Sequence, residues 1–218
     1  MKVAIVSESP ADEAAVLILL VGLLQQPIEV FSSPTLRRRP GGWTGVLRTI
    51  PTVLRHLYYN TDADALVAVL DSDRSVVHQA AHDAPDAAEP DCRLCELKSE
   101  VARIRGFLRP VEGRQPLKIA LGLAVPQVEA WYLTGQDPHV SEAAWLSGLL
   151  SGTLPYDSKS LKTKVYGTDR PSLDLETRRA REEAERIVRD GKLPLLEQLF
   201  PGGFGALAAD VRGWCPGQ

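Results

Sequence analysis

The sequence is poor in the residues that mark several classes of protein. It has three cysteines and one methionine in 218 residues, and aromatic residues make up only 6%. A small, odd number of cysteines argues against a disulfide framework and predicts a cytoplasmic protein. The few aromatics argue against an extended platform for stacking bases. The longest apolar run, residues 14–24, is about half of the ~20 residues that a membrane-spanning helix needs, so we expect no membrane association.

Motifs of several common enzyme classes are also absent. The chain has no Gly-x-Ser-x-Gly elbow, no P-loop and no Gly-x-Gly-x-x-Gly, which argues against serine hydrolases and the usual nucleotide-binding folds. The net charge of −3 excludes nucleic-acid binding by bulk positive charge. With 44% hydrophobic residues, the chain can still bury a substantial core.

Apolar segments of strand length alternate with segments of helical spacing. We expect strands at about 2–7, 28–31, 65–70 and 118–125, and helices at about 12–24, 43–59, 95–108, 126–134, 143–150, 176–189 and 193–200. This order predicts an α/β fold with a mostly parallel central sheet flanked by helices. We expect a core over residues 1–150 and a C-terminal basic segment with helices over 151–218, packed on that core. Residues 154–177 are expected to be irregular, and a glycine-rich tail follows the last helix.

Acidic residues follow two of the predicted strands. Glu8 comes just after the first strand, Asp71 and Asp73 follow the strand at 65–70, and Asp12 lies one helical turn beyond Glu8. The carboxyl ends of parallel strands share one edge of a sheet, where ligands bind. Converging carboxylates favour a hard cation such as Mg²⁺ and suit phosphodiester hydrolysis. The alternative is local: Asp-x-Asp is common in turns, and Glu8 could cap a helix.

Three segments together resemble a known family. They are Glu8-Ser-Pro-Ala-Asp12, Leu70-Asp-Ser-Asp73 and Val125-Pro-Gln-Val-Glu-Ala-Trp-Tyr-Leu133. Their order and placement resemble the TOPRIM-type nuclease domain, most closely a branch related to the overcoming-lysogenization-defect (OLD) nucleases. In that group an acidic residue follows the first strand, a later strand ends in Asp-x-Asp, and a helix carries a Pro-x-x-Glu-Ala-Trp-like motif. The chain departs at Ser9, where glycine is usual in that group.

The resemblance implies a TOPRIM-like core and a site that binds Mg²⁺ or Mn²⁺. The implied metal ligands are Glu8, Asp12, Asp71, Asp73 and Glu129. It also implies an ATPase partner and a role in defence against mobile DNA. Glu129 has a second interpretation, in which it is a solvated or capping residue on a helix whose apolar side chains pack inward.

Basic residues are the expected partners of a phosphate backbone. Arg37, Arg38 and Arg39 lie in an acid-free window between Glu29 and Asp62, and could position nucleic acid, most simply DNA, beside the carboxylates. The alternative is a solvated loop. The resemblance to OLD-type nucleases implies a catalytic lysine near the metals. We assign Lys162 to this role, with Lys159 as the alternative. If Lys162 is the catalytic lysine, we expect Lys159 to bind nucleic acid.

Four further residues have the composition of a zinc site. His78 and His82 precede Cys92-x-x-Cys95, and together they could form a His₂Cys₂ group for a structural Zn²⁺. The alternatives are a mobile Ala- and Asp-rich loop, or a redox role for the cysteine pair.

The sequence therefore leads to one main hypothesis and two alternatives. The main hypothesis is metal-dependent cleavage of nucleic acid, with Glu8, Asp71, Asp73 and Lys162 as catalytic residues. A non-catalytic regulatory or binding module that acts with a partner protein, with or without zinc, is the second. Hydrolysis of small phosphoesters by the same carboxylates is the third.

Overall fold

A computed structural model describes residues 1–32, 42–84 and 86–214. Its centre is a four-stranded sheet with the order β2-β1-β3-β4, in which every neighbouring pair is parallel. The strands are β1 (Lys2–Val6), β2 (Glu29–Phe31), β3 (Ala65–Asp71) and β4 (Lys118–Ala124). The predicted α/β class with a parallel sheet is therefore confirmed.

Helices connect the strands and continue beyond the last of them. The connecting elements are α1 (Pro10–Leu24), α3 (Trp43–Asn60), the 3₁₀ turn η1 (Ala80–Asp83) and α4 (Arg93–Phe107). After β4 come α5 (Val128–Tyr132), α6 (Glu142–Ser151), α7 (Ser158–Tyr166), α8 (Leu173–Arg189), α9 (Leu193–Leu199), the π turn η2 (Pro201–Gly205) and α10 (Ala206–Arg212).

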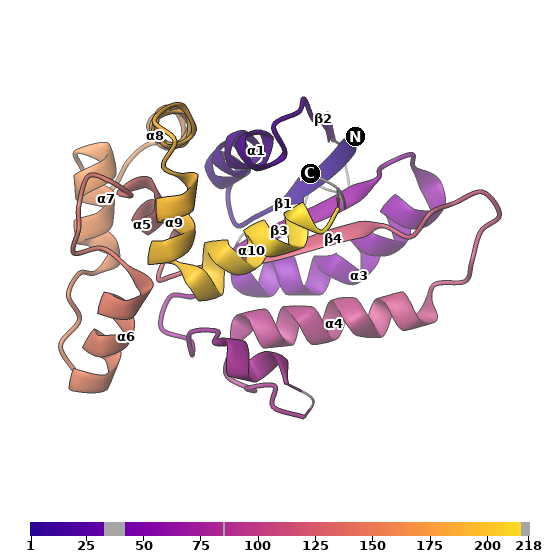
Figure 1. The fold of residues 1–218 in the computed structure, drawn as a ribbon, viewed down its shortest axis with the longest axis horizontal. Coiled ribbons are helices and arrows are strands. Elements are labelled where there is room, and N and C mark those ends of the chain that lie inside the picture. Colours follow the sequence, from indigo (N-terminus) through magenta and orange to yellow (C-terminus); the bar gives the residue numbers. More distant parts are fainter. Residues whose placement is uncertain (33–41, 85, 215–218) are drawn as a thin grey trace.

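Strands β1, β3 and β4 are largely buried on both faces, which accounts for their almost wholly apolar sequences, whereas the edge strand β2 is mostly exposed. Because side chains alternate along a strand, Val67 and Val69 of β3 face one core, whereas Leu66 and Leu70 face the other. Helices α3 and α4 cover the second face, and α1 and α10 cover the first (Figure 1). The sheet thus forms the middle layer, and its carboxyl edge points toward α5, α6 and α7 (Figure 1).

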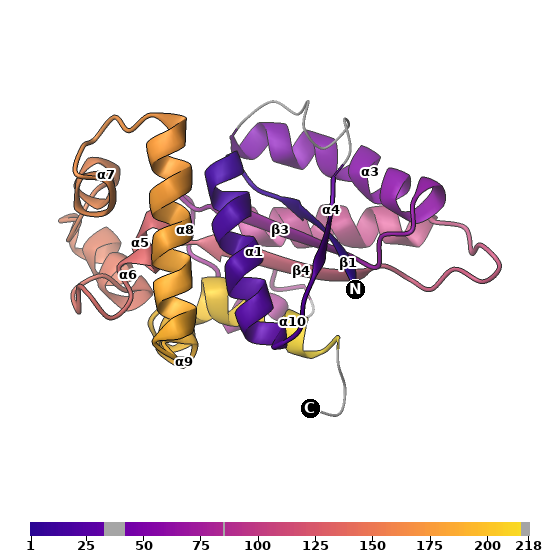
Figure 2. The same ribbon diagram turned by 90° about the horizontal axis from the view of Figure 1, so that it is seen from above.

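Helix α8 lies side by side with α1 (Figure 2). Small buried residues on both helices, Ala11 and Ala15 on α1 and Ala180 and Ala184 on α8, keep the contact close. A Cβ at Gly22 would lie 2.7 Å from Cγ2 of Val188. This packing carries α8, from a distant part of the chain, to the carboxyl edge of the sheet.

The prediction that residues 154–177 are irregular is wrong. The segment contains α7 and the first turn of α8. A capping box between Asp157 and Ser160 begins α7, and Leu161 and Val165, four residues apart, bury one side of it. Flanking polar residues mask this short apolar stripe in the sequence.

Two further boundaries differ from the sequence prediction. Pro126 was expected to begin a helix, but it follows a cis peptide bond and the helix begins at Val128. The glycine-rich tail contains η2 and α10, and Leu207 of α10 packs over Gly122 of β4. Residues beyond 151 therefore supply part of the cover of the sheet. Within the described ranges, no helix has the length and apolar character needed to cross a membrane.

Candidate functional site

Two carboxylates meet at the carboxyl edge of the sheet because β1 and β3 are parallel neighbours. The backbone N–H of Asp71 donates to Oε1 of Glu8 at 3.1 Å. Oδ1 of Asp71 in turn accepts from the N–H of Val128, the first residue of α5, at 3.0 Å. These two bonds tie the ends of β1, β3 and α5 together around Asp71.

Asp12 and Glu129 complete an inner group with Glu8 and Asp71. Burial, followed by the charge of Glu129, raises the pKa of Asp12 to about 7. Burial, followed by the charges of Asp12, Glu129 and Glu8, raises the pKa of Asp71 well above its ordinary value. Burial also raises the pKa values of Glu8 and Glu129. The four groups therefore share one poorly solvated environment, in which negative charge is costly without a cation.

Lys162 of α7 and Glu176 of α8 border this inner group. The ammonium of Lys162 lies 3.9 Å from Oε1 of Glu129 and 3.6 Å from Oε1 of Glu176. The hydroxyl of Tyr166 donates to Oε1 of Glu129 at 3.3 Å. Glu129 is 5% exposed and faces these partners, so the structure does not place it on a solvated helix surface.

Asp73 lies at the rim of the group. It is exposed, has a left-handed φ of 49° and pairs with Arg93, whose Nη1 lies 2.8 Å from Oδ2. The same Nη1 donates to the carbonyl of Asp71 at 2.6 Å, and the guanidinium lies 5.6 Å from the centre of the Trp43 ring. Asp73 thus has the turn geometry that is the alternative explanation of the Asp-x-Asp motif, and it also lies next to the inner group.

One buried hydroxyl in this region lacks a partner. The hydroxyl of Tyr132 has no hydrogen bond within the described part of the chain. Burial, followed by the charge of Asp12, raises its pKa, and Glu129 and Asp71 contribute in the same direction. The unsatisfied hydroxyl beside three carboxylates is the polar environment that a bound ion or its water would complete.

A cavity of about 640 Å³ opens next to Asp73. Three cationic side chains line it: Arg74, Arg93 and Lys159. Lys159 therefore lies by the cavity, whereas Lys162 is the lysine paired with the inner carboxylates.

The predicted basic loop falls outside the described residues. Arg37, Arg38 and Arg39 lie in the range 33–41, which the structure does not describe. The described chain resumes at Gly42, where a Cβ would lie 3.8 Å from Oε2 of Glu8.

The His/Cys group is assembled as the sequence predicts. The ligand atoms of His78, His82, Cys92 and Cys95 all lie within 4.8 Å of one another, so the group could hold a metal ion. His82 lies in η1, whereas His78 precedes it in a loop, so the two histidines do not share a helix. Burial raises the pKa of Cys92 to about 11, which argues against a redox-active thiol.

Sequence reasoning missed four neighbours of the carboxylates: Arg93, Tyr132, Tyr166 and Glu176. Tyr132 lies within residues 125–133, where its aromatic character favours a core role. Glu176 arrives only through the packing of α8 on α1, for which no local motif exists. Arg93 lies inside the Cys-x-x-Cys spacing, where the sequence directs attention to the cysteines.

No protein-family model, curated protein or solved structure matches the chain.

Proposed function

We propose that the protein is a Mg²⁺- or Mn²⁺-dependent hydrolase of phosphodiester bonds in nucleic acid, with a TOPRIM-like core. The observation that carries this proposal is the convergence of Glu8, Asp12, Asp71 and Glu129 at one sheet edge, each with a raised pKa. The resemblance of three sequence segments to OLD-type nucleases supports the same function.

The donor set suits a hard divalent cation. Mg²⁺ prefers carboxylate oxygens and keeps several waters, and the Tyr132 hydroxyl offers a further polar contact. Six carboxylates surround the site: Glu8, Asp12, Asp71, Asp73, Glu129 and Glu176. In the described chain, Lys162 pairs with Glu129 and Glu176, and Arg93 pairs with Asp73. We propose Glu8, Asp12, Asp71 and Glu129 as metal ligands, with Asp73 completing the group from the rim. When bound, the ion polarises the phosphate and stabilises developing charge.

The side chains around the cavity have separate parts in this proposal. Lys159 and Arg74 attract the phosphate backbone toward the edge of the sheet. Lys162, held between Glu129 and Glu176, stabilises negative charge on the phosphate in the transition state. Arg37, Arg38 and Arg39 lie outside the described residues, and their part in phosphate binding is proposed from the sequence alone. The preferred substrate in this proposal is DNA.

The test is metal-dependent cleavage by purified protein. Plasmid, linear and single-stranded DNA, RNA and a small phosphomonoester are each incubated with Mg²⁺, Mn²⁺ or chelator. The variants are Asp71→Asn, which retains an oxygen to accept from Val128, and Asp169→Asn at an exposed position as the matched control. We expect cleavage of nucleic acid that needs the metal and falls by at least about 10²-fold in Asp71→Asn only.

Other outcomes contradict the proposal in different ways. Equal activity of Asp71→Asn would overturn the site, and turnover of the phosphomonoester alone would overturn the substrate class. If no substrate is cut under any condition, the hydrolase is rejected in favour of a non-catalytic module that acts with a partner such as an ATPase.

The two metal-competent groups differ in donor chemistry. The sheet-edge group offers oxygen donors, whereas His78, His82, Cys92 and Cys95 offer two sulfur and two nitrogen donors. Thiolate and imidazole are ligands for zinc rather than for magnesium or manganese. We therefore propose Zn²⁺ for the His/Cys group.

A further inference from the structure

The spacing of the His/Cys group matches the edges of a zinc tetrahedron. Nδ1 of His78 lies 3.6 Å from Sγ of Cys92 and 3.5 Å from Sγ of Cys95, and Nδ1 of His82 lies 3.7 Å from Sγ of Cys95. Zn–S bonds of about 2.3 Å and Zn–N bonds of about 2.0–2.1 Å at tetrahedral angles place N and S about 3.6 Å apart. The side chains are thus already at ligand spacing.

The surroundings of His78 hold its ring with Nδ1 facing the two cysteines. Nε2, the nitrogen away from the cysteines, lies 3.2 Å from Oδ2 of Asp83. A ligating histidine usually donates its other ring N–H to a carboxylate in this way. The ammonium of Lys98 lies 2.7 Å from Oδ1 of Asp83 and 3.2 Å from the same Nε2 of His78. On the other side, a Cβ at Gly202 would overlap the carbonyl oxygen of His78, so the backbone there is closely packed.

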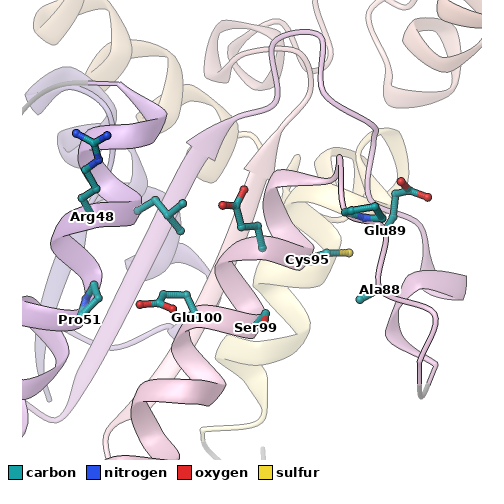
Figure 3. A pocket seen from close by; sticks show the side chains of 10 residues that line it. Arg48, Pro51, Ala88, Glu89, Cys95, Ser99 and Glu100 are labelled. Atoms are coloured by element: carbon teal, nitrogen blue, oxygen red, sulfur yellow. The ribbon is translucent and has the colours of Figure 1, made fainter.

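The sulfur of Cys95 points toward the segment before α4. Figure 3 shows Cys95 on α4 with its sulfur directed toward Ala88 and Glu89, away from Arg48 and Pro51 of α3. The other four residues line a cavity of about 470 Å³ that also borders Cys95, so an ion can approach the group from this side.

The group joins the interior of one loop to the helix at which that loop returns. Residues 72–92 leave the carboxyl end of β3 and return at Cys92, the N-cap of α4. His78 and His82 lie within this loop, and Cys92 and Cys95 lie at its return. Arg93, between the cysteines, reaches back to Oδ2 of Asp73 and the carbonyl of Asp71.

We infer that His78, His82, Cys92 and Cys95 bind one structural Zn²⁺ that closes the 72–92 loop onto α4 and thereby holds Arg93 against the end of β3. Four protein ligands leave no open position for substrate, so the ion is structural rather than catalytic. Arg93 is a positioning residue that acts through Asp71 and Asp73. The proposal of a zinc site is independent of the proposed hydrolase activity.

The first test is metal content. We expect elemental analysis of the purified full chain to give one zinc per protein, retained in His139→Ala and Cys215→Ser and lost in His82→Ala and Cys95→Ser. His139 is exposed and is not a member of the group. His82→Cys keeps a donor atom and should restore binding. Zinc below half an equivalent in the parent, with no tetrahedral thiolate spectrum after Co²⁺ addition, would overturn the site.

The second test addresses the loop. Hydrogen exchange of the parent chain, with zinc and after chelation, should show faster exchange over residues 76–92 without zinc, and unchanged exchange in β1 and β3. Unchanged exchange in the loop would overturn the structural role, even if zinc binds. Because neither test measures cleavage, their failure is distinguishable from failure of the proposed hydrolase.

Discussion

Lys162 reaches carboxylates on two different helices, which sets it apart from its neighbours on α7. Lys159 lines the cavity beside Asp73, and Lys164 forms a salt bridge with Asp137 at 2.6 Å, away from the cluster. Lys159, Lys162 and Lys164 lie on one helix and have the same side chain, so their variants differ only in where the positive charge is removed.

We predict that Lys162→Met lowers kcat for metal-dependent cleavage by about 10²-fold, because a preorganised charge at the phosphate is lost. Lys164→Met should leave kcat and KM unchanged. Lys159→Met should raise KM, with a weaker dependence of binding on salt, because it removes a phosphate contact. Steady-state kinetics of the three variants provide the measurement. Equal kcat for Lys162→Met and Lys164→Met would exclude the assignment.

The sequence predicted the site residues that lie at strand ends, but not those that reach the site through the packing of helices. Glu8 and Asp71 follow neighbouring parallel strands, so their proximity follows from the fold class. Asp12 follows Glu8 by one turn. Glu176 and Tyr166, in contrast, depend on how α7 and α8 pack beyond the sheet. Such packing is decided by contacts distant in sequence, which local periodicity does not encode.

At the scale of elements, the packing of α1 against α8 places Glu176 beside the inner carboxylates. The contact leaves no room at Gly22, whereas a Cβ at Gly106 in α4 would meet nothing within 4 Å. Both residues lie within helices, so the same substitution tests packing separately from helix propensity.

We predict that Gly22→Ala lowers the free energy of unfolding by about 1–3 kcal/mol through overpacking against Val188. That loss corresponds to roughly 2–4 °C in Tm per kcal/mol for a chain of this size. Gly106→Ala should leave Tm unchanged or raise it, because alanine favours helix. Thermal unfolding followed by circular dichroism measures both. A Tm for Gly22→Ala at or above that of Gly106→Ala would refute the close contact.

The helices also show which element predictions succeed. The apolar spacing of α3 predicts its buried residues Val46, Ile50 and Leu57, and the helix continues through Pro51. Helix α7 is short and mostly polar, and its stability depends on burial against neighbouring helices. Long periodic segments could therefore be predicted, whereas short ones held by tertiary contacts could not.

At the scale of the whole molecule, the buried carboxylates make stability depend on pH and metal together. Their folded pKa values are raised, to about 7 for Asp12, above ordinary values near 4. Between these values the folded state keeps protons that the unfolded chain has lost. The free energy of unfolding therefore falls as pH rises through this window. Glu142, buried against the N–H groups of Gly202 and Gly203 and also with a pKa of about 7, acts in the same direction.

We predict that, in chelator, Tm is higher at about pH 5 than at about pH 8. Mg²⁺ should raise Tm more at the higher pH, because it binds the ionised carboxylates that protons otherwise neutralise. Asp71→Asn should reduce the effect of Mg²⁺, whereas Glu142→Gln should reduce only the dependence on pH. Scanning calorimetry provides the measurement. A Tm that rises with pH in chelator, or a Mg²⁺ effect that is independent of pH, would contradict this account.

The route of the chain through the site has a consequence for its synthesis on the ribosome. Glu8 and Asp12 emerge before β4 is made, whereas Lys162 and Glu176 follow it. Helix α10, which packs over Gly122 of β4, emerges later still. A nascent chain therefore carries Glu8 and Asp12 long before Lys162 and the α10 cover of β4 exist. Contacts between such distant segments also slow folding, and the contacts of Lys162 with both Glu129 and Glu176 require α7 and α8 to have emerged.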